Sequence, residues 1–356
     1  MLIVGIPKEI KANEYRVSMI PADIEYLTAL NIQVYVQSTA GNGANFTDDD
    51  YKNAGAIICA DINEIYEKAN LIIKVKEPQP EEYELINDKH TIFTFFHFAS
   101  SSLLLKTMIE KKATCLAYET LRNNNSFPIL AQMSRIAGEQ AMIEANKFRS
   151  SIIDANNNDN NNKDDEITII GVGNVGKAAA YKAIELNYKK INLIDKDYEK
   201  LKELKKENED LMIYEMNHLN LSKLLMKSNI IIGSIYNNGE KAQKLIINDL
   251  LVIMPNDSVF MDVAIDQGGM TEKSKPTTVK DPYIKYHNTH IYCVPNIPSL
   301  VPHEASIKLS NVICPYVRTL AQEKTNDELE SAINLKKGEI IHSSLRLLLL
   351  PLMLHI

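Results

Sequence analysis

The stretch GVGNVG contains Gly171, Gly173 and Gly176 at the G-x-G-x-x-G spacing of a dinucleotide-binding turn. It follows the strand-like ITII and opens the helix-like KAAAYKAIEL, the context in which a backbone and a helix N-terminus approach a pyrophosphate. Asp195 comes about 20 residues later, where a carboxylate accepts hydrogen bonds from both hydroxyls of an adenosine ribose. The pattern predicts NAD and disfavours the 2′-phosphate of NADP, although the adjacent Lys196 would weaken that preference.

A nicotinamide cofactor implies hydride transfer, which needs a substrate anchor and an acid/base group. Arg16 follows the first strand-like run and offers the planar fork that recognises a carboxylate. Lys74 and Lys76 share one face of the apolar run LIIKVK by period-two alternation, and nearness to the end of the strand favours Lys76. His97 ends the apolar run TIFTFFH, where an imidazole can titrate near neutral pH, although a structural histidine is the commoner occupant of such a place.

Two further polar residues follow apolar runs later in the chain. Asp266 ends the strand-like VFMDVAID and is followed by two glycines, which let a backbone bend around a ligand. Asp262 lies inside that run and is the less favoured of the two carboxylates. Asn296 stands where another strand-like run meets a proline-rich segment. His287 and His290 have no convincing ligand set around them, so no metal site is expected.

The elements that must position these residues follow an α/β alternation. Short β-branched runs alternate with helix-like segments, which predicts parallel sheets flanked by helices with active groups at the carboxyl ends of the strands. A long amphipathic segment at 134–151 leads into the asparagine-rich stretch 153–166, which we expect to be a mobile loop. A second alternation follows, and the helical pattern at 303–322 should return the chain to the first domain. The expected strands cover 2–6, 32–37, 56–60, 71–76, 91–97, 114–119, 167–170, 191–197, 211–216, 229–235, 259–266 and 290–296.

Composition sets the broad class of the protein. The 356 residues exceed what one core usually needs and suit two domains. A net charge of −7 argues against nucleic acid as a partner, and no run reaches the roughly 20 apolar residues of a membrane span, the apolar end 345–356 included. The N-terminus has no signal-peptide pattern, and the four cysteines are spaced as buried free thiols of a reducing compartment. We expect a soluble cytoplasmic protein.

Several long motifs are spread over nearly the whole chain. They are VGIPKEIKANEYRVSMIPA (4–22), FTDDDYKNAGA (46–56), KVKEP (74–78), TFFHFASS (94–101), AYET (117–120), GVGNVG (171–176), DVAIDQGG (262–269), PTT (276–278) and VPNIPSLVP (294–302). Together they resemble the alanine dehydrogenase and pyridine nucleotide transhydrogenase family. The resemblance implies two Rossmann-like domains with parallel sheets, the NAD-binding domain (132–302) being inserted into a substrate domain formed by 1–131 and 303–356. It also implies a cytoplasmic homo-oligomer, usually a hexamer.

Carried over by position, the resemblance gives roles to individual residues. Arg16 and Lys76 match a pyruvate-binding pair, His97 the catalytic acid/base, Asp266 the carboxylate that handles water and ammonia, and Asn296 a residue that closes the substrate pocket. Lys74 is then expected to be a bystander. The expected cofactor-binding set is Ser134 at a phosphate, Gly171, Gly173, Asn174, Val175 and Gly176 in the turn, Asp195 at the ribose, Lys200, and Ile235, Ile265 and Ile297 around the nicotinamide.

The resemblance implies reversible oxidative deamination of L-alanine to pyruvate and ammonium by NAD. The alternatives are a transhydrogenase-like NAD(H)-binding component, a dehydrogenase of another amino acid, and a homologue that has lost activity; KVKEP, His97 and IDQGG favour the dehydrogenase. Three departures from the family pattern stand out. The asparagine-rich stretch 153–166 replaces a glycine-rich stretch that commonly precedes the strand of the glycine turn. MSRIAGE (133–139) exchanges an acid and a base, which predicts a reversed Arg135–Glu139 ion pair. YNNGEKAQK (236–244) lacks a proline and borders the cofactor.

Overall fold

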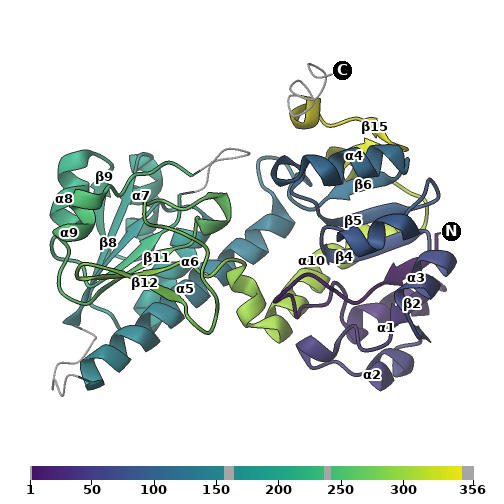
Figure 1. Ribbon diagram of the computed structural model, residues 1–356, viewed down its shortest axis with the longest axis horizontal. Coiled ribbons are helices and arrows are strands. Elements are labelled where there is room, and N and C mark those ends of the chain that lie inside the picture. The colour runs from purple at the N-terminus through teal and green to yellow at the C-terminus, as the bar shows by residue number, and fades with distance from the viewer. Residues whose placement is uncertain (1, 156–163, 236–241, 347–356) are drawn as a thin grey trace. The chain divides into compact units, whose positions relative to one another are not determined.

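The computed structural model describes residues 2–155, 164–235 and 242–346 (Figure 1). The chain divides into two compact units. Unit 1 comprises Met1–Met133 and Val301–Ile356, and unit 2 comprises Ser134–Leu300. Unit 2 is therefore continuous in sequence and is inserted between the two segments of unit 1.

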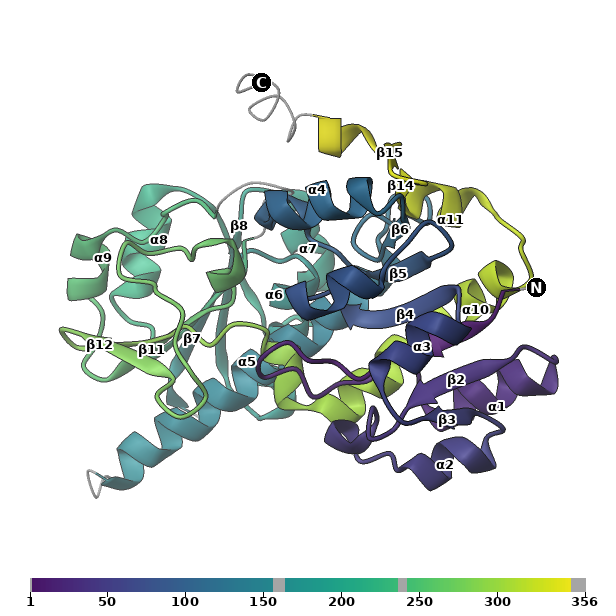
Figure 2. The same ribbon diagram turned by 45° about the vertical axis from the view of Figure 1, so that its right-hand side comes forward.

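Unit 1 is built on an eight-stranded sheet in the order β15-β14-β6-β5-β4-β1-β2-β3 (Figure 2). The strands from β6 to β3 pair in parallel, whereas β14 pairs antiparallel with β6 and β15 antiparallel with β14. The strands are β1 (Val4–Ile6), β2 (Val34–Gln37), β3 (Ile57–Cys59), β4 (Leu71–Lys76), β5 (Thr91–Phe95), β6 (Thr114–Ala117), β14 (Ile333–Lys336) and β15 (Glu339–Ile340).

Helices connect the parallel strands of unit 1 and cover its sheet. Because β4 and β5 are central, their side chains are buried almost throughout, which explains why their sequences read as continuous apolar runs. The helices and 3₁₀ turns are α1 (Pro21–Ala29), η1 (Asn42–Ala44), α2 (Asp48–Asn53), α3 (Ile62–Lys68), η2 (Pro80–Leu85), η3 (Phe98–Ser100), α4 (Ser102–Glu110), α10 (Pro302–Ala321) and α11 (Asp327–Ala332).

Unit 2 has a seven-stranded sheet in the order β12-β13-β11-β10-β7-β8-β9, parallel except for the β12–β13 hairpin. The strands are β7 (Glu166–Ile170), β8 (Lys190–Asp195), β9 (Met212–Glu215), β10 (Ile230–Gly233), β11 (Ser258–Asp262), β12 (Tyr283–Tyr286) and β13 (Thr289–Tyr292). The helices and turns are α6 (Asn174–Glu185), α7 (Tyr198–Glu207), α8 (His218–Leu225), α9 (Asn248–Val252), η5 (Ile265–Gln267) and η6 (Ile297–Leu300).

The long helix α5 (Pro128–Ala155) contains the boundary between the two units. It runs further in both directions than the segment 134–151 expected from the sequence. Consequently, the expected asparagine-rich loop begins later than residue 153, and Glu166 already belongs to β7. The remainder of that loop, at 156–163, and the apolar end at 347–356 lie outside the described residues.

The two-sheet α/β architecture expected from the sequence is confirmed, with corrections at particular strand ends. β5 stops at Phe95 and β11 at Asp262, so His97 and Asp266 lie beyond their strands rather than in them. The antiparallel strands β12, β14 and β15 were not expected. The four cysteines are buried and free, as expected. Among the described helices, none is long and apolar enough to cross a membrane.

A buried histidine of unit 1 gives the fold a testable dependence on pH. His90 accepts a hydrogen bond from the Asn87 N–H at Nδ1 (3.0 Å), and its Nε2 lies 2.8 Å from the Tyr66 carbonyl oxygen, so Nε2 carries the proton of a neutral ring. Burial lowers the pKa of His90 below its usual 6.5. Its contribution to stability is therefore complete above pH 6.5 and is lost as the pH falls through the lowered pKa.

We expect the urea midpoint of the wild type to fall more steeply below about pH 6 than that of His90→Gln. Glutamine keeps a donor for the Tyr66 carbonyl but does not titrate. The matched control is His287→Gln, because His287 is exposed and its removal should leave the pH dependence unchanged. Parallel pH curves for the wild type and His90→Gln would show that His90 does not carry this effect.

Candidate active site

The two lysines of β4 have different surroundings. Lys74 is fully buried, and its Nζ lies 3.2 Å from Glu9 Oε2 and 3.1 Å from Glu82 Oε1. Lys76 is half-buried at the end of the strand. Ile73 pairs with Phe93 and Lys76 with Phe95, so β4 has one more residue than β5 over this stretch. This bulge interrupts the regular alternation that had placed both lysines on one face, and it leaves Lys76 as the more accessible ammonium.

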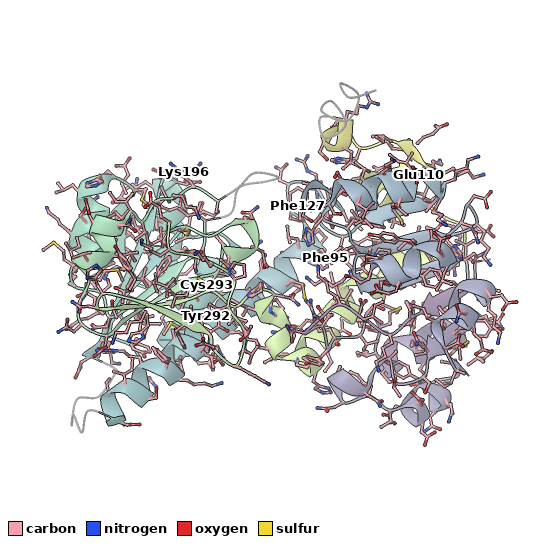
Figure 3. All side chains as sticks on the ribbon, viewed as in Figure 1. Phe95, Glu110, Phe127, Lys196, Tyr292 and Cys293 are labelled. Carbon is pink, nitrogen blue, oxygen red and sulfur yellow. The ribbon has the colours of Figure 1, made fainter. Side chains whose placement is uncertain are left out.

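His97 lies two residues beyond Phe95, the last residue of β5, which is labelled in Figure 3. Its backbone is left-handed (φ 47°, ψ 44°), which ends the strand and is costly for a residue other than glycine. Glu119 supports this conformation, because its carboxylate accepts from the His97 N–H (2.6 Å) and the Phe96 N–H (3.3 Å). The exposed imidazole stacks on the Phe95 ring, with the centroids 5.6 Å apart.

Arg16 is 2% exposed and forms an ion pair with Glu14 that was not expected from the sequence. Its Nε and Nη2 donate to the two carboxylate oxygens of Glu14 at 2.7 and 2.6 Å, and its Nη1 lies 3.2 Å from the Met133 sulfur. Because Glu14 occupies one edge of the guanidinium, a substrate carboxylate would have to approach the side formed by Nη1 and Nη2. Arg16 is thus a paired arginine as well as a candidate ligand.

The same kind of contact supports each of the three candidate substrate residues of unit 1. Glu9 accepts from the backbone N–H of Lys76 (3.3 Å), Glu119 from that of His97 (2.6 Å) and Glu14 from that of Arg16 (3.1 Å). Sequence reasoning did not assign these carboxylates, although they lie in the motifs PKEIKANEYR and AYET. Glu9 and Glu119 act on distant parts of the chain, for which the sequence offers only the motif as a signal, whereas Glu14 lies two residues from Arg16.

The glycine-rich turn of unit 2 has the geometry of a dinucleotide site. Gly171 follows β7 with φ +90°, and Gly173 is the N-cap of α6. A Cβ at Gly176 would lie 1.9 Å from the Gly171 carbonyl oxygen, so only glycine allows this close approach of helix and turn. By contrast, a Cβ at Gly173 would meet nothing within 4 Å. The open space at Gly173, in front of the N-terminus of α6, fits a cofactor pyrophosphate.

Asp195 ends β8 beside this turn. Its Oδ2 accepts from the Val172 N–H (2.7 Å) and its Oδ1 from the Asp197 N–H (2.9 Å), so the half-buried carboxylate is fixed in direction. Each oxygen retains a lone pair for a ribose hydroxyl. Lys196 is exposed at the surface of unit 2 (Figure 3). The arrangement fits the ribose of NAD.

We expect Asp195→Ala to raise the KM for NADH by about tenfold or more, because hydrogen bonds to a charged group contribute about 1.5–3 kcal/mol each. The ratio of kcat/KM for NADH over NADPH should fall at the same time, since the repelling charge is removed. Steady-state kinetics with both cofactors measures both effects. The matched control is Asp197→Ala, because Asp197 caps α7 by accepting from the Lys200 N–H (3.1 Å). An unchanged KM for NADH in Asp195→Ala would remove Asp195 from the ribose site.

The other expected cofactor residues lie in unit 2 but do not form one cluster. Ser134 is half-buried in α5, and the exposed Lys200 lies in the first turn of α7. Ile265 belongs to one hydrophobic core cluster, against which Ile235 packs, whereas Ile297 belongs to another. Within unit 2, the structure thus brings Ile235 and Ile265 to the same cluster and leaves Ile297 apart. Asn174 and Val175 open α6 directly after Gly173.

Asp266 and Asn296 come together in unit 2. Asp266 lies in the 3₁₀ turn η5, and its Oδ2 accepts a long hydrogen bond (3.4 Å) from the Asn296 N–H. The buried Asp262 binds the loop between η5 and residue 274, because its carboxylate accepts from the Met270 N–H (2.7 Å) and the Ser274 hydroxyl. Burial raises the pKa of the Asp262 carboxyl. Asp262 is therefore a buried support of the loop that carries Asp266.

Lys244 also binds this loop, through backbone carbonyl oxygens. Its Nζ donates to the carbonyl oxygens of Gly268 (2.5 Å), Gly269 (2.8 Å) and Thr271 (2.9 Å). This lysine belongs to the segment 236–244 that departs from the family pattern, of which 236–241 lies outside the described residues.

Two other expectations concern an ion pair of α5 and a metal site in the described ranges. Arg135 and Glu139 both lie in α5, and the expected ion pair between them stays a prediction. Within the same described ranges, no group of three or more His, Cys, Asp or Glu side chains is arranged to hold a metal ion.

Two family models match most of the chain. The family model for the N-terminal domain of alanine dehydrogenase/PNT matches residues 5–137, and the model for the C-terminal domain matches residues 160–343. The alanine dehydrogenase of Halomonas elongata is 34% identical over 353 residues, covering 95% of this chain and 94% of that protein. The alanine dehydrogenase of Mycolicibacterium smegmatis is 34% identical over 355 residues, covering 96% and 93%.

Solved structures show the same relationship at the level of the fold. A structure of L-alanine dehydrogenase matches with a TM-score of 0.92 and 29% identity, covering 99% of this chain and all of that one. A transhydrogenase from Sinorhizobium meliloti matches with a TM-score of 0.83 and 19% identity, covering 96% and 99%, which shows a shared fold alone. With both family models matched and full-length relatives at 34% identity, the chain belongs to the alanine dehydrogenase/PNT family.

Proposed function

We propose that this protein catalyses the NAD-dependent, reversible oxidative deamination of L-alanine, in which alanine, water and NAD⁺ give pyruvate, ammonium, NADH and a proton. Besides family membership, one observation in unit 1 supports this proposal. Lys76 ends β4, His97 follows the end of the paired strand β5 by two residues, and a carboxylate accepts from the backbone N–H of each. A cation and a titratable imidazole are the groups that a 2-oxo acid and its amino acid require.

In this proposal the residues of unit 1 bind and protonate the substrate. The Lys76 ammonium binds the substrate carboxylate or carbonyl oxygen, and the Nη1–Nη2 side of Arg16 adds a second cationic contact. His97 takes a proton from the water that adds to the imine and returns one to the departing amine. The left-handed backbone of His97 and its stacking on Phe95 fix the direction of the ring. Both cations favour the anionic substrate in an orientation that aligns its Cα for reaction.

In the same proposal, the residues of unit 2 hold the cofactor and the nucleophile, which is water in one direction of the reaction and ammonia in the other. The turn at Gly173 and the N-terminus of α6 bind the pyrophosphate, Asp195 binds the ribose, and Asp266 orients water or ammonia with Asn296 beside it. When bound, NAD supplies the acceptor for the hydride of Cα. Unit 2 is accordingly the NAD-binding domain and unit 1 the substrate domain.

The deciding experiment follows NADH oxidation in the presence of pyruvate, with and without ammonium, and NAD reduction by L-alanine at alkaline pH. Ammonium-dependent turnover in the first assay and alanine-dependent turnover in the second are expected. Turnover with another 2-oxo acid instead of pyruvate would identify a dehydrogenase of another amino acid. NADH binding without any turnover would favour a transhydrogenase-like binding component and would overturn the proposal.

Family resemblance also supports a proposal about assembly and location. We expect a homohexamer in the cytoplasm, and light scattering of the purified protein should give six times the monomer mass of 40.2 kDa. A monomer at assay concentrations would contradict the proposed assembly without affecting the proposed reaction.

A further inference from the structure

A buried ionic cluster lies next to Lys76 in unit 1. It consists of Lys74, Glu9 and Glu82, each less than a tenth exposed, with the ammonium of Lys74 between the two carboxylates at 3.2 and 3.1 Å. Although burial alone would lower the pKa of Lys74, the two carboxylates raise it, so the ammonium stays charged. Three buried charges are costly to desolvate, which calls for an explanation beyond packing.

Glu9 connects this cluster to the backbone of Lys76. While its Oε2 faces Lys74, its Oε1 accepts from the Val75 N–H (2.6 Å) and the Lys76 N–H (3.3 Å). These two N–H groups lie at the bulge, where β4 has its extra residue relative to β5. A bulge leaves backbone groups outside the regular ladder, and Glu9 satisfies two of them from a distant part of the chain.

Glu82 fixes the chain on the other side of Lys76. Its Oε2 accepts from the Gln79 N–H (2.7 Å), and its Oε1 accepts from the Tyr66 hydroxyl (3.1 Å) as well as contacting Lys74. Since Gln79 follows Lys76 by three residues, the backbone is anchored both at Lys76 and just beyond it. Lys74 links the two anchors through its ion pairs with Glu9 and Glu82.

We propose that Glu9, Lys74 and Glu82 form a positioning cluster, which fixes the bulge of β4 and thereby sets the direction in which Lys76 presents its ammonium to the substrate carboxylate. None of the three needs to touch the substrate. Lys74 is fully buried with both carboxylates against it, so it acts through the backbone of Lys76 rather than as a second ligand. This inference rests on the proposed role of Lys76 in the proposed function.

The test compares Glu9→Ala with Glu9→Gln in the full-length protein. Glutamine retains an oxygen that can accept from Val75 and Lys76, whereas alanine does not. We expect Glu9→Ala to raise the KM for pyruvate by about tenfold or more, with the Kd for NADH within about twofold of wild type. Glu9→Gln should stay within about threefold of wild type on both measures.

Matched variants separate positioning from general loss of stability. Arg149→Met breaks the partly buried Arg149–Asp165 ion pair of unit 2, and it should lower the melting temperature without changing the KM for pyruvate. If Glu9→Ala does not fold, Glu82→Ala replaces it, because that change leaves a neutral Lys74–Glu9 pair and frees only the Gln79 N–H and the Tyr66 hydroxyl. It should raise the KM for pyruvate by severalfold. An unchanged KM in a folded Glu9→Ala or Glu82→Ala, or an equal rise in Arg149→Met, would overturn the proposal.

A second measurement does not depend on activity. Amide hydrogen exchange in a peptide spanning residues 71–79 should be faster in Glu9→Ala than in wild type and close to wild type in Glu9→Gln. If exchange in Glu9→Ala is faster than in wild type as expected, but the wild type has no dehydrogenase activity, the proposed function is wrong while the cluster still fixes the bulge. If the wild type is active and exchange is unchanged in Glu9→Ala, the positioning inference alone is wrong.

Discussion

Replacing His97 by asparagine is expected to lower the turnover of pyruvate amination by about two to four orders of magnitude, the usual contribution of a general acid/base. NADH binding, measured by fluorescence titration, should remain within about twofold of wild type, since the cofactor turn belongs to unit 2. Asparagine is the appropriate substitution because His97 has φ 47° and ψ 44°, a conformation that asparagine tolerates better than most residues other than glycine. The variant therefore removes the imidazole while preserving the backbone.

Two comparisons sharpen this prediction. His97→Ala should lose at least as much turnover, because it also strains the left-handed backbone that Glu119 holds. The exposed His287→Asn should retain full turnover, which controls for the general effect of losing a histidine. A His97→Asn variant that turns over near the wild-type rate would remove His97 from the mechanism and would leave Lys76 and Arg16 as binding groups only.

The elements that sequence reasoning located well are those whose patterns are local. LIIKVK was expected at 71–76 and is β4, because a strand buried on both faces reads as a continuous apolar run. The glycine turn was found from its own spacing. The strands β12, β14 and β15 were missed, because each is short and depends on an antiparallel partner. Their pairing has no signature within the strand itself.

The same limit applies to the candidate site. Residue types and motifs singled out Lys76 and His97 as candidates, but the carboxylates that hold their backbone, Glu9 and Glu119, are distant in sequence from them. The alternation rule for strands also failed where it mattered, because the bulge adds a residue to β4 before Lys76. Lys74 was expected to be a bystander because the resemblance assigned substrate binding to Lys76, and nothing in the sequence indicated that Lys74 is fully buried between two carboxylates.

The second large effect is expected when Gly173 or Gly176 of the glycine-rich turn of unit 2 is replaced by alanine. The two positions are only three residues apart, but the two variants should have different defects. At Gly176 a Cβ would lie 1.9 Å from the Gly171 carbonyl oxygen and 2.8 Å from the Ser234 hydroxyl. Because the first of these is a backbone atom, the turn or the helix must move. We expect Gly176→Ala to destabilise the protein by about 2–3 kcal/mol or more, measured by urea unfolding.

Gly173→Ala is the matched partner of that variant. Among the described residues, apart from its chain neighbours, its Cβ would meet nothing within 4 Å, and its φ of −69° suits alanine. The loss of stability should therefore be at most about 1 kcal/mol, from the poorer N-cap. The new methyl group would stand where the backbone must approach the pyrophosphate, so the Kd for NADH should rise by about tenfold or more. If Gly173→Ala bound NADH as wild type does, the pyrophosphate could not lie against this turn. Equal stability losses in the two variants would show that Gly173 is needed for packing. The cofactor lies against Gly173 only if Gly176→Ala mainly lowers stability and Gly173→Ala mainly weakens NADH binding.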